Sequence, residues 1–312
     1  MARVRSMRAP RAGARARFLS RRTLVLYAVM LPTLVVIGLF AYYPAITGMV
    51  FSFFHWRPGY ESDFLGLANY ERMLTDRIWW TSFLNLLVIF VFGIATWVVP
   101  FLAAELVISL SGERLRFVFR ALLVAPIAFP QMVTFLIWGF FYDPSRGVIN
   151  GFLRGVGLPD LAHNWLGDPG TALLALMFIG FPWIAGLPFL IFLTGLQNIP
   201  QEIFDAAALD GVGRFRRVFA IDVPIIARQI ALLGFIAVIA TLQYGMAAYV
   251  LTGGGPDNST QVPILRMLAA AFNGGDWGYA ATLSTTLFLV IATIGLLVVA
   301  SRSLGKAVRG KA

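Results

Sequence analysis

Six long apolar runs constrain the fold of this chain more than any other feature of its sequence. The hydrocarbon core of a bilayer is about 30 Å thick, so a spanning helix needs about 20 apolar residues. The runs cover Leu24–Tyr43, Phe83–Leu102, Ala121–Phe141, Thr171–Leu193, Ile230–Leu251 and Tyr279–Ala300. With 59% hydrophobic and 13% charged residues, the 312-residue chain has no room for a separate soluble domain. We therefore predict an all-α membrane protein in which residues 23–302 form one domain of six transmembrane helices.

The distribution of Lys and Arg predicts the orientation of these helices. Nineteen of the 25 Lys and Arg residues lie in the basic arm 1–22, in the loops after the second and fourth runs, and near the C-terminus. The other six lie in the remaining loops. Because basic loops stay on the cytoplasmic side, we expect a multi-pass protein of the cell membrane. Its arm, its tail 303–312 and the loop after the fourth run would all be cytoplasmic.

Two other interpretations of the basic arm are weaker. Residues 20–24, Ser-Arg-Arg-Thr-Leu, resemble a twin-arginine export signal. The apolar run behind them is long enough to span, and no clear cleavage site follows, so we expect the segment to be retained. The arm could also bind nucleic acid, but it shows no pattern of aromatic residues interleaved with its arginines, since Phe18 is its only aromatic residue. Anchoring on the cytoplasmic side explains the charge, and we expect lipid contact and no nucleic-acid partner.

Catalytic and metal-binding motifs are absent from the sequence. It contains no G-x-x-x-x-G-K-[ST] phosphate loop, no H-E-x-x-H and no G-x-S-x-G, and it has no Cys. Its two histidines, His55 and His163, have no neighbours typical of metal ligands. We therefore expect no catalytic residues, no metal site and no cofactor bound by this chain.

Ionisable residues are nearly absent from the six runs. Glu105 lies near the cytoplasmic end of the second run, where it can reach lipid headgroups. A carrier driven by protons or sodium usually needs such groups inside the membrane, so their scarcity indicates an external energy source. Uncharged polar residues do occur there and suit a polyhydroxylated solute; those we expect to line a substrate pathway are Asn85, Gln131, Gln243 and Tyr244. The alternative for each is a hydrogen bond between packed helices.

The longest internal cytoplasmic loop, about 198–228, has a pattern typical of two short helices. Asn198 or a neighbour can cap the first helix, Pro200 suits its first turn, and Ala206–Ala208 favour helix. Asp210-Gly211 supplies a stop, and a second helix from about Gly213 ends at Pro224. A structured loop of this kind fits a docking element. The alternative is a loop that only packs on its own helices.

Residues Pro200–Pro224 resemble the EAA loop of permease subunits of bacterial ABC importers, most closely the carbohydrate-uptake permeases of the maltose type. The family pattern is roughly E-A-A-x-x-D-G-A followed by L-P, and the chain reads D-A-A-A-L-D-G-V and then D-V-P. Three further stretches are similar to the family in order: FLGLANYERML, APIAFPQMVTFLIWGFFYDPSRGVIN and LTGGGPDNSTQVPILRM. Asp205 stands where the family has Glu, and Val212 where it has Ala. Asp keeps the charge but is one methylene shorter.

The resemblance implies a type I importer permease fold and a division of labour among several chains. A second permease subunit, of different sequence, would pair with this one in the bacterial inner membrane. Two ATPase subunits, which bind ATP and Mg²⁺, would dock beneath the pair, and an extracellular solute-binding protein would deliver the substrate. The residues implied to form the ATPase-coupling surface are Asp205, Ala206, Ala207, Asp210, Gly211 and Pro224.

The leading functional hypothesis is an ATP-driven importer subunit for a sugar or oligosaccharide. A second hypothesis keeps this machinery but changes the solute to glycerol phosphate or another polar metabolite; an anionic solute would call for a buried Lys or Arg, and the runs contain none. A third is a secondary carrier that works without partners, which uptake by the purified chain without ATP would support. A membrane-bound enzyme lacks candidate catalytic residues.

Overall fold

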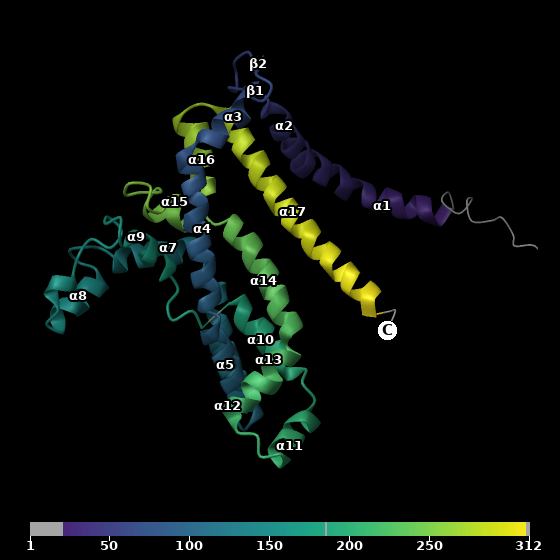
Figure 1. Ribbon diagram of the computed structural model, residues 1–312, viewed down its shortest axis with the longest axis vertical. Helices are drawn as coiled ribbons and strands as arrows, with labels where there is room; N and C mark the ends of the chain where they lie inside the picture. The colour runs from purple at the N-terminus through teal and green to yellow at the C-terminus, as the bar shows by residue number, and fades with distance from the viewer. Residues whose placement is uncertain (1–20, 185, 310–312) are drawn as a thin grey trace, which may run out of the picture.

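The computed structural model describes residues 21–184 and 186–309, which form a helical protein with one short β-hairpin (Figure 1). All but the last two residues of the basic arm 1–22 lie outside the described residues, as do residues 310–312 of the tail. The remainder of the tail continues the last helix, which ends at Arg309.

The N-terminal elements form one long apolar rod that leads to the hairpin. The rod consists of α1 (Arg21–Ile37), the π-helix η2 (Gly38–Tyr42) and α2 (Tyr43–Phe51). The hairpin strands β1 (Phe54–His55) and β2 (Asp63–Phe64) follow, and then α3 (Ala68–Thr75). The two strands are antiparallel, and Phe54 pairs with Phe64. Apolar side chains of the rod are largely exposed, Phe40 to 79%. In Figure 1, α1 extends away from the other helices, so this surface is available to lipid or to another subunit.

The central and C-terminal elements form the body of the molecule. The central elements are α4 (Arg77–Ala95), α5 (Val98–Ser109), α6 (Glu113–Val124), η3 (Ala125–Ala128), α7 (Gln131–Phe141), α8 (Val148–Gly155), η4 (Pro159–Leu161), α9 (Ala172–Met177) and α10 (Leu187–Gln197). The C-terminal elements are α11 (Gln201–Leu209), α12 (Arg214–Arg217), the π-helix η5 (Val218–Asp222), α13 (Val223–Ile225), α14 (Ala227–Leu242), α15 (Met246–Leu251), α16 (Pro263–Leu268), the π-helix η6 (Ala269–Asn273) and α17 (Trp277–Arg309). The hairpin and α11 lie at opposite ends of the body (Figure 1), which we call the hairpin end and the α11 end.

Four described helices are long and apolar enough to cross a membrane, or five if one bent pair of helices counts as a span. They are Val25–Phe51, Arg77–Ser109, Ala227–Leu251 and Trp277–Val298, and the bent pair is Glu113–Ala128 with Gln131–Phe141. These match all the predicted runs except Thr171–Leu193, which is divided between α9 and α10. The prediction of a helical membrane protein is confirmed. Six continuous spanning helices are not found among the described residues.

Local backbone conformation explains why the third predicted run is bent and the fourth is divided. The bent pair turns by 88° just before Pro130, where Phe129 is extended because proline disfavours helix in the preceding residue. Between α9 and α10 the backbone takes positive φ at Gly180, Trp183 and Gly186. A scale of hydrophobicity counts these residues as apolar or neutral and does not register that they end a helix.

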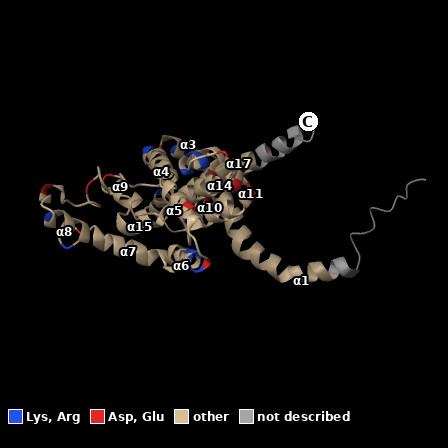
Figure 2. Cartoon of the chain, turned by 90° about the horizontal axis from the view of Figure 1, so that it is seen from below, with Lys and Arg blue, Asp and Glu red and all other residues tan. Residues whose placement is uncertain are grey.

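Charged residues are gathered at the ends and in the loops. Figure 2 shows them on α3, α6 and α8, whereas α7, α15 and the described part of α1 are almost free of charge. Each end of the body has a buried apolar cluster that packs its helices together. Phe189 and Leu193 of α10 pack with Ile226 near the α11 end, and Trp79 and Leu283 pack at the hairpin end.

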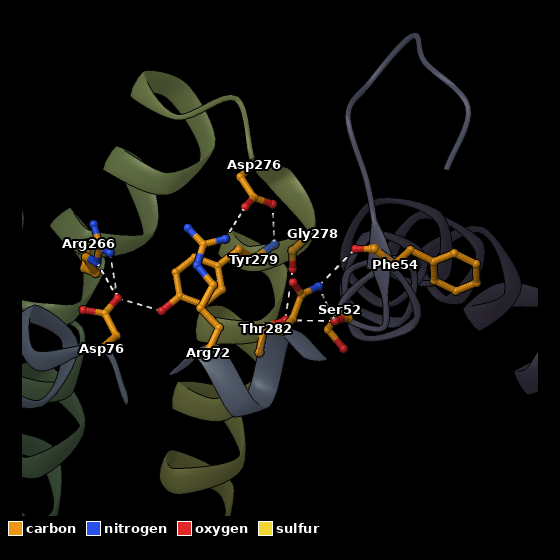
Figure 3. Close-up of polar contacts among 10 residues, drawn as sticks. Ser52, Phe54, Arg72, Asp76, Arg266, Asp276, Gly278, Tyr279 and Thr282 are labelled. Atoms are coloured by element: carbon orange, nitrogen blue, oxygen red, sulfur yellow. Dashed lines mark hydrogen bonds and ion pairs between the residues drawn. The ribbon is translucent and has the colours of Figure 1, made fainter. Parts of the chain in front are cut away.

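The hairpin is pinned to the first turn of α17. Thr282 donates from Oγ1 to the carbonyl of Ser52 at 2.9 Å, and the Asn69 amide donates to the carbonyls of Ser52 and Phe54 (Figure 3). Gly278 is required at this contact, because a Cβ there would lie 2.0 Å from the carbonyl oxygen of Phe54. The N-terminal segment and α17 are thus joined at the hairpin end.

A buried carboxylate joins three helices beside this contact. Asp76 caps α4 by accepting from the amide of Trp79, and its Oδ2 accepts from Arg266 of α16 at 2.7 Å and from the Tyr279 hydroxyl of α17 at 2.6 Å (Figure 3). Burial alone would raise the pKa of Asp76. The hydrogen bonds from Tyr279 and Arg266 outweigh burial and leave this pKa below its usual range. Arg72 lies over the Tyr279 ring, 4.0 Å from its centroid, and pairs with Asp276.

We expect Asp76→Asn to lower the free energy of unfolding by about 3 kcal/mol, because it leaves the charge of Arg266 without its buried partner. Arg72→Gln is the control: its ion pair is more exposed, and we expect a loss below about 1 kcal/mol. Thermal unfolding of the purified protein in detergent measures both.

The pH dependence gives a second readout of the same substitution. The folded pKa of Asp76 is depressed, so its contribution is fully present above the unfolded value of about 3.8 and disappears as pH falls through the folded pKa. The difference between the protein and Asp76→Asn should therefore stay constant from neutral pH down to about pH 4 and close below it. A difference that closes well above pH 4 would contradict this account.

Candidate functional site

The loop 198–228 forms two short helices around a glycine turn, as predicted. Helix α11 ends in a Schellman motif: the amide of Val212 donates to the Ala207 carbonyl at 2.9 Å, and that of Gly211 donates to Ala208. Gly211 has φ +67°, a conformation that residues with a side chain adopt at a cost. Asp210-Gly211 therefore ends α11 and sets the direction of α12.

The predicted coupling residues do not all lie on the surface of this loop. Asp205, Ala206, Asp210 and Gly211 are exposed, and Pro224 is exposed further along. The exception among them is Ala207, which is only 5% exposed and faces inward. A buried alanine gives a partner no surface, so its small size serves the packing of α11 on the body.

Apolar side chains that the sequence analysis did not assign to docking are the most exposed part of the loop. Leu209 is 90% exposed and Phe215 is 80% exposed, and the Phe215 and Phe219 rings are 5.0 Å apart. Large apolar side chains that lie together on an exposed surface often mark an interaction site. The signal in the sequence was the spacing of Phe215 and Phe219, four residues apart on one helical face.

Two local expectations about the loop are wrong. Asn198 does not cap α11: it follows the end of α10 and donates back to the Thr194 carbonyl at 2.8 Å, while Pro200 occupies the N-cap. Pro224 does not end the second helix, which continues to Ile225. The π-helix η5 precedes Pro224, and its wider turn relieves the clash that a proline ring makes inside a regular α-helix.

A buried ion triad joins this loop to α5. The Arg217 guanidinium donates to Asp222 at 3.0 Å and to Glu105 at 3.1 Å. The Asp222 side chain is 1% exposed and that of Glu105 is 11% exposed. Arg217 also lies over the Phe204 ring of α11, 4.9 Å from its centroid. One side chain therefore connects α11, η5 and α5. The expectation that Glu105 reaches lipid headgroups is therefore wrong. Its ion-pair partner, Arg217, lies 112 residues away in the sequence, so no local pattern indicates the pair.

A second candidate site is a cavity at the interruption of the fifth predicted run. Helix α14 ends at Leu242 and α15 begins at Met246, so Gln243–Gly245 are not helical. Next to them lies a cavity of about 260 Å³ whose lining includes Gln131, Tyr244, Trp183 and Thr96. Non-helical backbone at membrane depth is tolerated where protein or a cavity satisfies it. The lining residues include no Asp, Glu, Lys or Arg.

Only part of the predicted pathway meets at this cavity. Gln131 and Tyr244 both line it, and Gln243 is exposed at the helix break beside it. Asn85 does not line it, because its amide donates to the Gln261 carbonyl at 2.8 Å and joins α4 to the loop before α16. For Asn85 the alternative of a structural hydrogen bond is therefore the observed one.

Trp183 is the cavity residue that the sequence analysis missed. Its φ of +56° is uncommon for a bulky side chain, and surrounding rings hold it there: Phe92, Phe178 and Phe181 each lie within 5.4 Å between centroids. Such a conformation persists only when its neighbours impose it. The Phe181-Pro182-Trp183 sequence inside an apolar run was the signal for it.

The helical spans and the structured loop define a polytopic membrane subunit, and comparison with known proteins identifies its class. Residues 98–307 match the family described as the binding-protein-dependent transport system inner membrane component. The chain belongs to this family. Because its relatives are ABC transporter permeases, it is a permease subunit, a non-catalytic membrane component whose ATPase is a separate chain. The predicted family is confirmed, and a carrier that works alone is excluded.

Two curated relatives carry named solutes. The diacetylchitobiose uptake system permease protein NgcF of Streptomyces coelicolor is 29% identical and aligns with 78% of this chain and 72% of its own. The sn-glycerol-3-phosphate transport system permease protein UgpA of Yersinia pestis is 31% identical and aligns with 91% of this chain and 95% of its own. Both align over most of this chain.

The fold is also that of a solved importer. A chain from the crystal structure of a bacterial ABC transporter involved in the import of the acidic polysaccharide alginate superposes with a TM-score of 0.75. The match covers 89% of this chain and 94% of that one, at 20% identity. The interruptions of the spans therefore occur within an importer permease fold.

We expect Arg217→Gln to loosen the loop from α5, because Glu105 and Asp222 would be left facing each other without a cation. Breaking a buried ion pair costs about 3–5 kcal/mol. Hydrogen exchange of the purified protein should become faster throughout α11 and α12. Arg216→Gln is the matched control, because Arg216 is an exposed neighbour without an ion pair among the described residues. Equal exchange in the two variants would contradict a role for the triad.

Proposed function

We propose that this chain forms half of the translocation pathway for a neutral sugar or oligosaccharide. The observation that carries the proposal is the uncharged cavity lined by Gln131, Tyr244 and Trp183. Amide and hydroxyl groups can hydrogen-bond to sugar hydroxyls, and aromatic faces suit the apolar faces of sugar rings. The relative named for diacetylchitobiose uptake supports the same class of solute.

The second candidate solute is glycerol phosphate, for which another relative is named. A phosphate group brought to membrane depth would need Arg or Lys beside it, because burying an unpaired charge is costly. The cavity lining offers neither. This observation favours the sugar over the phosphate ester.

The proposed assembly contains six spans and several partners. The bent pair counts as the third span, and α9 with α10 as an interrupted fourth. The α11 end would face the cytoplasm, as the Lys and Arg distribution indicates. A second permease would complete the pathway, and an extracellular binding protein would deliver the solute at the hairpin end. Two ATPase subunits, with their ATP and Mg²⁺, would dock at the α11 end.

The proposed ATPase-docking surface is the exposed side of the helix pair in loop 198–228. Asp205, Ala206, Asp210 and Gly211 supply small and acidic groups, and Leu209 supplies the most exposed apolar side chain. Ala207 supports this surface from below, and Pro224 lies near the C-terminal end of the second helix. Movement of the ATPase would pull α11, and Arg217 would transmit the pull to α5 through Glu105.

We expect Ala206→Arg to abolish ATPase docking without unfolding the permease. The substituted side chain is exposed, so stability should be unchanged, while its bulk and charge would obstruct a closely fitted partner. Co-purification of the ATPase and solute uptake in proteoliposomes should each fall more than about tenfold. The matched control for ATPase co-purification is Ala68→Arg, also at an exposed helical alanine but at the hairpin end, which should leave the ATPase bound. Normal uptake and a retained ATPase in Ala206→Arg would refute the docking surface.

We expect Gln131→Leu and Tyr244→Phe to impair uptake while the ATPase stays bound. Each change removes a polar group from the cavity and keeps its size, so loss of a hydrogen bond to a sugar hydroxyl should weaken transport by about tenfold. Uptake of labelled oligosaccharides by the complete importer measures the effect. Asn85→Leu is the contrast: it should lower thermal stability, because it removes the hydrogen bond to Gln261. Unchanged uptake in both cavity variants would exclude this pathway.

A further inference from the structure

A second cavity, at the α11 end, has the opposite character from the uncharged one. Its volume is about 550 Å³, and α5, α6, α10, α11 and α12 contribute to its lining. The charged residues that line it are Glu105, Glu113, Arg116, Arg120, Arg214 and Arg217. Ile108, Phe117 and Phe204 supply apolar surface beside them. The cavity thus presents guanidinium groups and apolar side chains to one volume.

Three of the four arginines have no carboxylate partner. Arg217 is held by Glu105 and Asp222. Among the described residues, Arg116, Arg120 and Arg214 form no ion pair; Arg116 only donates from Nε to the Leu110 carbonyl. The four arginines outnumber the three carboxylates of Glu105, Glu113 and Asp222, so the cavity has a net positive charge.

One nitrogen of these arginines is shielded from water. The Nε of Arg120 is buried and has no hydrogen-bond partner. A buried donor left without a partner is costly, and more so when it is charged. The rule that basic residues face the cytoplasm explains why arginines occur in this region. It does not explain why arginines of two separate helices, α6 and α12, line one cavity, or why a donor in it is hidden from solvent.

We propose that this cavity binds the phosphate group of an anionic ligand and thereby links α6 to the loop 198–228. Phosphate oxygens match the paired N–H donors of guanidinium groups. Arg120 of α6 and Arg214 of α12, two helices far apart in the sequence, line the same cavity. The apolar lining suits the part of the ligand that bears the phosphate. Two sources share this chemistry: the headgroup of an anionic phospholipid and a soluble phosphate. Figure 2 shows basic and acidic residues gathered at α6.

The consequence for transport rests on the proposed function of loop 198–228. Gln201 and Phe204 of α11 and Arg217 line the same cavity, so a bound phosphate would stiffen the connection between the docking surface and α5. Ligand occupancy would then regulate coupling from inside the cell, separately from the solute in the uncharged cavity.

The test compares two double variants with the same change of charge on the same two helices. Arg120→Gln with Arg214→Gln alters the cavity, and Arg114→Gln with Arg216→Gln alters exposed arginines that do not line it. The assembled importer is purified in maltoside detergent and given phosphatidylglycerol, a galactolipid with neutral headgroup, or inorganic phosphate. Retained lipid is measured by native mass spectrometry, and phosphate binding by protection of α6 and α12 from hydrogen exchange.

The proposal predicts that phosphatidylglycerol or inorganic phosphate binds and that the galactolipid does not. Binding should weaken by roughly tenfold or more in the cavity variant and be unchanged in the control. Binding of the phospholipid alone identifies a headgroup, and binding of inorganic phosphate identifies a soluble ligand. Equal losses in both variants, or no binding of either ligand, would overturn the site. Lipid retention and hydrogen exchange need neither ATP hydrolysis nor solute. Failure of the docking proposal can therefore be distinguished from failure of the phosphate site.

Discussion

Arg217 holds two largely buried carboxylates, and the connection between the exposed loop and the membrane helices depends on that ion triad. In a low-dielectric interior one cation between Glu105 and Asp222 offsets a repulsion that would otherwise force the two apart. Because the same guanidinium lies over the Phe204 ring, α11 cannot shift without disturbing α5. A flexible loop would absorb a partner's movement, whereas the proposed ATPase docking would use this fixed connection to transmit it.

The network at the hairpin end anchors the other end of the same span. Asp76 caps α4 and binds Arg266 and Tyr279, while Glu105 lies near the end of α5. Helices α4 and α5 together form the candidate span Arg77–Ser109. One continuous element thus has a charged attachment at each end and an uncharged cavity alongside its middle. A displacement at the α11 end can alter the contacts at the cavity, because the span between them is stiff and tethered.

The sequence predicts the parts of this arrangement that depend on local chemistry. Apolar runs of spanning length, the Ala-rich helix and the Asp210-Gly211 stop depend on neighbouring residues, and they appear as expected. The division of Thr171–Leu193 depends on backbone conformations at Gly180, Trp183 and Gly186 that hydrophobicity does not encode. The burial of Ala207 and the pairing of Arg217 with Glu105 depend on how distant helices pack. A single sequence carries no direct signal for such contacts.

The size and chemistry of the uncharged cavity bear on how such a subunit can select a solute. About 260 Å³ is below the range of about 300–1,000 Å³ that encloses most small ligands, so a disaccharide would not be enclosed by this chain alone. In the proposed assembly the missing wall would come from the second permease. The surface left exposed by α1 and the interrupted spans is where another apolar chain would pack. Trp183 is held by its own chain in a costly conformation, which indicates a rigid half-site. Selectivity would then arise only when two such half-sites face each other, and an ATP-driven movement that separates them would release the solute.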